Sequence, residues 1–131
     1  MIDIENMLFT KVKNDLPDTV KMGNSYENVP SKFPYVSLEV VDNTIYTPFI
    51  DSARVENAVD IMVEVNVYSN KTSGKKTECK KVMANVDSTL STLGLTRTFC
   101  QPIPNFEDAT IYRITARYRA IVDKNLNIYR R

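Results

Sequence analysis

Two kinds of spacing between apolar residues divide this chain into helices and strands. In two segments the apolar residues recur at steps of three and four, which is the period of a helix with one buried face. These segments predict a helix over 4–16, which could resume as far as Met22, and a second helix over 75–93. The apolar positions are Ile4, Met7, Leu8, Val12 and Leu16 in the first, and Cys79, Val82, Met83, Val86, Leu90 and Leu93 in the second. Gly94 stands where the second helix should end.

Other segments alternate apolar and polar residues, which is the pattern of strands with one buried face. The alternation is strongest at 59–67 and at 110–122, and shorter strands are expected at 35–41, 95–103 and 128–129. The resulting order is α-β-β-α-β-β-β. It predicts an α+β fold with a mainly antiparallel sheet and both helices packed on one face of that sheet.

The length and composition fit a single domain. The chain has 131 residues, of which 43% are hydrophobic and 25% are charged, as is ordinary for one globular unit. We therefore expect one domain over 1–131. No apolar run approaches the roughly 18 residues that a membrane span needs, and the first residues lack the basic stretch of a signal peptide. We expect a soluble protein with no membrane partner.

The connection between the first two strands, at about 43–57, is long for a hairpin and rich in apolar residues. Its apolar residues include Ile45, Tyr46, Phe49 and Ile50. One interpretation is that the strands extend as a long β-hairpin whose tip packs on its own core. The other is that a neighbouring subunit covers the segment, since exposed apolar patches often mark association sites. These four residues are therefore candidates for an oligomerisation interface.

Charge is placed unevenly along the chain, although the net charge is only +1. Five lysines against one glutamate give +4 over 71–81, and six basic residues against one aspartate give +5 over 111–131, so the remaining residues carry −8. One basic and one acidic surface would suit self-association or a polyanionic neighbour. Lys75 and Lys76 also oppose the dipole at the start of a helix, which indicates either a nearby anion or simple surface charge.

The strand at 110–122 carries a row of arginines, Arg113, Arg117 and Arg119, on its polar face. Like charges this close repel each other unless opposite charges lie beside them. Carboxylates across the sheet are the favoured partners, with Asp60, Glu64 and Glu107 as candidates. Alternatively the row lines a groove or channel that phosphate backbone passes through, or against which an acidic partner docks.

The sequence offers few residues suited to catalysis. The chain has no histidine, which removes the commonest general base and metal ligand. The stretch "SNKTSGKK" at 69–76 resembles a phosphate-binding loop, but Ser69 replaces the first glycine and Lys76 the metal-binding hydroxyl. Cys79 and Cys100 lack metal-ligand spacing, and we expect both to be free thiols in a reducing cytoplasm. We expect no enzyme activity and no cofactor.

Four stretches, read together, resemble a family of small tail-completion proteins from long-tailed phages and prophages of Gram-positive bacteria. They are "FPYVSLEVVDNTIYT", "DSARVEN", "VEVNVYSNKTSGKKTECKKVMANVDSTLSTLGLTR" and "DATIYRITARYRAIVD" with the final "IYRR". The resemblance spans about Phe33 to Arg131 and contains no catalytic motif. The family is similar to the tail terminators, which are also called minor capsid or head-tail joining proteins.

This resemblance implies a structural protein of the virion tail or neck, present in the host cytoplasm during assembly. Such a protein forms a ring, usually a hexamer, which caps the tail-tube protein and offers a surface to the head-tail connector proteins. A basic row facing the lumen of the ring would be compatible with sequence-nonspecific passage of DNA. The alternatives are a head-side connector (a stopper or adaptor), a monomeric sequence-nonspecific DNA-binding module and, last, a nucleotide-dependent enzyme built on Gly74 and Lys75.

Overall fold

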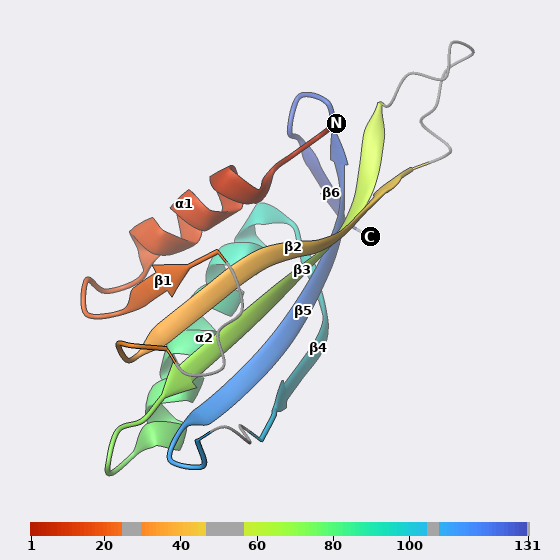
Figure 1. Cartoon of the computed structure of the whole chain (residues 1–131). Coiled ribbons are helices and arrows are strands. Elements are labelled where there is room, and N and C mark those ends of the chain that lie inside the picture. Colours follow the sequence, from red (N-terminus) through yellow and green to blue (C-terminus); the bar gives the residue numbers. More distant parts are fainter. Residues whose placement is uncertain (25–29, 47–56, 105–107, 131) are drawn as a thin grey trace.

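The chain folds as one twisted sheet with two helices on one of its faces (Figure 1). The computed structural model describes residues 1–24, 30–46, 57–104 and 108–130. The helices are α1 (Glu5–Asp15) and α2 (Lys75–Leu93), and the strands are β1 (Lys21–Gly23), β2 (Tyr35–Ile45), β3 (Ala58–Ser69), β4 (Thr96–Pro102), β5 (Tyr112–Asp123) and β6 (Ile128–Arg130). The α+β prediction, with both helices on one face, is confirmed.

The sheet is mainly antiparallel, as the sequence predicts. Its strands lie in the order β1-β2-β3-β5-β4, and β6 pairs with β5. The pairings of β3 with β2 and with β5 are the longest, and they form the centre of the sheet. Because β4 pairs with 114–119 of β5 and β6 with 120–122, the two short strands share one edge of the sheet.

The prediction that the first helix could resume as far as Met22 is wrong. The chain leaves α1 in an extended conformation at Leu16, and Lys21–Gly23 forms β1, which runs parallel to the start of β2. The Lys21 N–H donates a hydrogen bond to the Pro34 carbonyl oxygen at 2.9 Å. Three residues are too few to show a strand period, and their partner lies more than ten residues further on. The strand therefore depends on tertiary pairing.

The core lies between the helices and the sheet face that they cover. Its buried members are the apolar residues that the spacing predicted in both helices, except the partly buried Met7 and Leu93, together with every second residue of the long strands. The buried strand residues are Val36 and Leu38 of β2, Val59, Ile61, Val63, Val65 and Val67 of β3, and Ile114, Ala116, Tyr118, Ala120 and Val122 of β5. Alternation along three adjacent strands thus produces one continuous apolar surface, which α1 and α2 bury.

A β-bulge in β2 changes which side chains face the helices. Val40 pairs with Val63, but the next pair joins Asp42 to Met62, so Val41 is an extra residue. Beyond the bulge, Ile45 stands opposite the helix-facing Val59. Without the extra residue, Asp42 would take an inward position, because a shift of one residue reverses the faces of a strand.

The N-terminal segment packs along this part of β2. The Val40 N–H donates a hydrogen bond to a carboxylate oxygen of Glu5 at 2.8 Å, and the Asn43 amide donates to the Ile2 carbonyl oxygen at 2.9 Å. The ends of β2 and β3 continue past both helices (Figure 1), and β5 still pairs with β3 there on its other side. We call this end of the two strands, Val41–Tyr46 with Asn57–Asp60, the arm.

Candidate functional site

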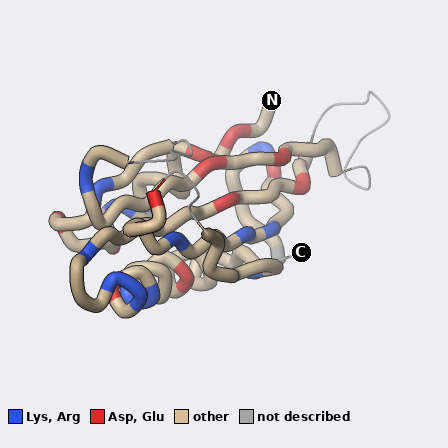
Figure 2. The backbone as a smooth tube through the Cα atoms, turned by 60° about the horizontal axis from the view of Figure 1, so that its bottom comes forward, with Lys and Arg blue, Asp and Glu red and all other residues tan. Residues whose placement is uncertain are grey.

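Charged side chains gather at different ends of the molecule. Figure 2 shows basic positions clustered where α2 begins, at the opposite end from the arm. Lys71, Lys76, Lys80 and Lys81 are all exposed there. On the arm side, Asp3 and Asp42 are exposed. The basic run at 71–81 therefore lies apart from the arm, whereas the basic run at 111–131 reaches the arm through Arg119 and Lys124.

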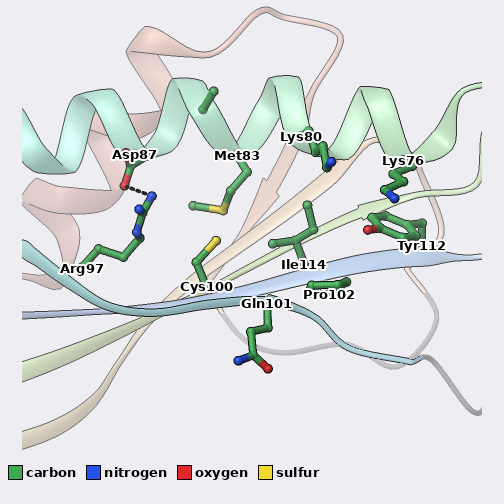
Figure 3. A pocket seen from close by; sticks show the side chains of 11 residues that line it. Lys76, Lys80, Met83, Asp87, Arg97, Cys100, Gln101, Pro102, Tyr112 and Ile114 are labelled. Atoms are coloured by element: carbon green, nitrogen blue, oxygen red, sulfur yellow. Dashed lines mark ion pairs between the residues drawn. The ribbon is translucent and has the colours of Figure 1, made fainter.

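A groove lies between α2 and the edge strand β4, next to the lysine cluster (Figure 3). Its volume is about 450 Å³. The residues that line it are Lys76, Lys80, Met83, Ala84, Asp87, Arg97, Cys100, Gln101, Pro102, Tyr112 and Ile114. A second hollow of about 530 Å³ shares Pro102 and Tyr112 with it, so the recessed surface continues past the end of β4. We call the first of these the α2–β4 groove.

The interior of the α2–β4 groove is apolar and its ends are charged. Met83 and Ile114 form its inner surface and are each 5% exposed. The Cys100 thiol points up from β4 toward Met83, as Figure 3 shows. Lys76 and Lys80 stand at one end. An apolar side chain with an acidic neighbour would match this arrangement.

An ion pair closes the other end of the groove. Arg97 Nη1 lies 3.3 Å from Asp87 Oδ1, and the Tyr118 hydroxyl donates a hydrogen bond to the same oxygen at 2.7 Å. The ring of Tyr118 is fully buried, and burial, followed by the hydrogen bond to Asp87, raises the pKa of its hydroxyl. Asp87 itself is half-buried at this end of the groove.

The "SNKTSGKK" segment is a turn that starts α2. Gly74 has a φ of +86° and precedes the helix, a conformation that glycine adopts without a steric penalty. Ser69, at the position of the first glycine of a phosphate loop, is buried, and its hydroxyl donates to Glu78 at 2.6 Å. The Lys75 ammonium group donates to the Thr110 carbonyl oxygen at 3.2 Å. These contacts tie the turn to the start of β5.

The arginine row lies on the sheet face opposite the helices, and two of its members have the predicted partners. Arg117 Nε is 3.2 Å from Glu64 Oε2, directly across the sheet, and Arg119 Nη2 is 3.0 Å from Asp60 Oδ2. Arg113 lies on the same face, beside a hollow of about 360 Å³ that Arg117 also lines. The predicted pairing with Asp60 and Glu64 is confirmed, whereas Glu107 lies outside the described residues.

Two of the four predicted interface residues, Ile45 and Tyr46, lie on the arm. Ile45 is 46% exposed, although its Cα lies opposite the buried Val59. The Tyr46 N–H donates to the Ala58 carbonyl oxygen at 2.9 Å, so the hairpin pairing continues at least this far. Phe49 and Ile50 lie outside the described residues.

The α2–β4 groove was not predicted from the sequence. The helical and strand periods identified α2 and β4 separately, but the groove exists because β4 is a short edge strand beside a long helix. The sequence places Cys100 and Pro102 in one row of alternate positions on β4, but only the structure shows that this row lines the groove. Alternation alone does not distinguish a recessed face from an open one.

Within the described part of the chain, no group of three or more histidine, cysteine, aspartate or glutamate side chains could hold a metal ion. The described helices include none that is both long and apolar enough to cross a membrane. Both cysteines are free thiols, as expected, with Cys79 buried and Cys100 exposed. Comparison with known proteins finds no family model that matches this chain and no curated protein that matches it.

Proposed function

We propose that this protein is a structural protein of a phage virion, a tail terminator that assembles as a ring. The ring caps the tail tube, stops its growth and provides the surface on which the head joins the tail. The protein acts at the tail or neck, and it assembles in the host cytoplasm. It has no catalytic role and uses no cofactor.

The structural observation that supports this proposal most is the presence of two unlike surfaces at opposite ends of the subunit. One is the arm, with exposed apolar and acidic side chains, and the other is an apolar groove beside a lysine cluster. A ring is built by a head-to-tail contact between two different complementary patches, repeated until it closes. The resemblance of 33–131 to tail-completion proteins supplies the biological setting.

Repetition of modest contacts makes such a ring stable. Each subunit makes the same contact twice, once through each surface, so closing the ring adds a contact without the entropy cost of recruiting another subunit. Tube binding is multiplied in the same way, because several identical faces of the ring bind at once. A weak single contact also lets the free subunit stay monomeric until a tube end is present.

Tail tubes assembled from purified tube protein test this proposal. We expect this protein to bind tube ends, seen by electron microscopy with a gold-labelled affinity tag, and to stop further elongation when fresh tube protein is added. Light scattering of the protein, alone and with tube protein, gives the number of subunits bound at each end. Tubes that lengthen as fast with the protein as without it would contradict the proposal.

The same preparation distinguishes the alternatives. A head-side connector would bind the purified portal or adaptor ring and leave tube ends free. A DNA-binding module would bind a short duplex as a monomer, with an affinity that falls steeply as salt rises. The pairing of Arg117 and Arg119 with carboxylates argues against the DNA-binding module, because a paired arginine has less charge to offer a phosphate.

A further inference from the structure

Two features of the subunit have complementary chemistry and lie too far apart to meet within one copy. The arm presents Val41 and Ile45, which are 45% and 46% exposed, beside the exposed carboxylate of Asp42. The α2–β4 groove presents an apolar interior beside Lys76 and Lys80. Figure 1 places the arm and the start of α2 at opposite ends of the molecule.

From this complementarity we infer that the arm of one copy docks in the α2–β4 groove of the next copy. The occupant of the groove is therefore a second copy of this chain, bound head to tail. This inference deepens the proposed function, on which it rests for the existence of a ring, by naming the two surfaces that join its subunits. The Ile45 side chain enters the groove over Met83 and Cys100, and Asp42 lies beside the two lysines.

The dimensions of the two surfaces agree with this contact. Along a strand, Asp42 and Ile45 are separated by about 10 Å. A groove of about 450 Å³ has room for one large aliphatic side chain and its flanking backbone. Beyond the bulge at Val41, Asp42 pairs with Met62 and Ile45 with Val59, so these two side chains lie on opposite faces of the arm. One face of the arm can then supply the apolar contact while the other reaches the lysines at the end of the groove.

The charges favour the same head-to-tail contact as the apolar residues. Among the described residues, the Thr44 hydroxyl donates a hydrogen bond to the Asp42 carboxylate at 3.1 Å. Lys76 and Lys80 are exposed at the end of the groove. Opposite charges on two unlike patches favour the head-to-tail contact over a symmetric pairing, in which arm would meet arm and groove would meet groove with like charges opposed.

The native Cys100 thiol gives a direct test, because it lies in the groove and the other cysteine is buried. We would prepare a donor variant, Ile45→Cys with Cys100→Ser, and oxidise it together with a larger, tagged wild-type acceptor. A disulfide forms only where Cα atoms approach within about 7 Å. We expect covalent heterodimers on non-reducing gels, about tenfold more than collision produces. The reaction is run with and without tube protein.

Matched controls locate the contact. Asn125→Cys with Cys100→Ser places the donor thiol on the exposed β5–β6 turn and should give heterodimers only at the collision level. Donors at Val41 and Thr44 allow for a shift of a few ångströms along the arm. The single variant Ile45→Cys carries both thiols, so it should form a ladder of covalent oligomers that ends at the closed ring.

The outcomes separate this inference from the proposed function. If light scattering shows rings on tube ends but no arm donor exceeds the Asn125 control, the ring uses other surfaces; the inference is wrong and the terminator proposal stands. If the ladder forms but the protein ignores tube ends, the docking is right and the terminator proposal is wrong. Monomers without cross-links in both conditions would overturn the inference, as would cross-linking of Cys100 to tube protein in place of a second copy.

Discussion

At the scale of single residues, three polar side chains that are far apart in the sequence contact one another. The buried Tyr118 of β5 donates its hydroxyl hydrogen bond to Asp87 of α2, which also pairs with Arg97 of β4. A charged acceptor makes such a bond stronger than one between neutral groups. The three residues therefore hold helix and edge strand together at the closed end of the α2–β4 groove.

Replacing Tyr118 with phenylalanine should lower the free energy of unfolding by about 1–2 kcal/mol, because it removes a hydrogen bond to a charged group while keeping the ring. Urea denaturation followed by circular dichroism measures the change. Tyr129→Phe is the matched control. Its hydroxyl also donates to a carboxylate, Asp123 at 3.0 Å, but the residue is exposed, so its loss should be much smaller. Equal losses in the two variants would contradict this account.

Cys79 gives the protein a pH-dependent stability. Burial, followed by the Glu78 charge, raises the pKa of its thiol from 9.0 to about 12. In the unfolded chain the thiol ionises near its ordinary pKa, so above about pH 9 the unfolded state loses a proton that the folded state keeps. The stabilisation is therefore complete below pH 9 and decreases as pH rises toward 12.

Between pH 8.5 and pH 10 we expect wild-type protein to lose about 1 kcal/mol of stability that a Cys79→Ala variant does not lose. The measurement is the slope of the free energy of unfolding against pH for the two proteins. The window ends at pH 10 because Tyr118, whose pKa is also raised, contributes above it. Parallel slopes would show that the Cys79 thiol ionises equally in both states.

At the scale of elements, the end of α2 determines how the chain enters the edge of the sheet. Gly94 has a φ of +105°, which lets it close the helix, and its N–H donates to the Ser91 carbonyl oxygen at 3.1 Å. A Cβ at this position would lie 3.3 Å from Ile128 of β6. The glycine thus ends the helix and leaves room for the last strand.

Gly94→Ala should cost about 1–2 kcal/mol of stability through backbone strain, and more through displacement of β6. Gly74→Ala is the matched control, since its φ of +86° is also positive but a Cβ there meets no atom within 4 Å. Thermal unfolding should therefore show a larger loss for the Gly94 variant. An equal loss would mean that the Ile128 contact relaxes without cost.

At the scale of the whole molecule, the separation of charge predicts how assembly responds to salt. The Debye length falls from about 8 Å at physiological ionic strength to about 3 Å at 1 M. A head-to-tail contact between the arm and the lysines of the α2–β4 groove should therefore weaken as salt rises, whereas a purely apolar contact would strengthen. Light scattering on tube-bound protein across a salt series measures the difference.

Reversing the lysine charges tests the same contact without added salt. Lys76→Glu with Lys80→Glu should reduce ring assembly, and a third change, Asp42→Lys, should restore part of it by exchanging the two charges. Lys11→Glu with Lys13→Glu on the exposed face of α1 is the control, because it makes the same change in net charge away from the groove. Equal effects of the two pairs would mean that only net charge matters.

The sequence by itself determined the helices, the long strands and the face of each that is buried. These follow from apolar periods within a single element, and α2 was predicted with the observed bounds, 75–93. The paired carboxylates of the arginine row were also predictable, because β3 and β5 are adjacent and both alternate regularly. Local spacing carries this information because each element buries one face against a common core.

Only the tertiary structure decided the features that need two distant segments. β1 exists through pairing with β2, the bulge at Val41 sets the facing of the arm, and the α2–β4 groove depends on where an edge strand ends beside a helix. Asp87 is half-buried for the same reason, since its partners come from β4 and β5. Contacts between distant segments leave no local period, so no pattern along the chain could reveal the groove or what faces it across the molecule.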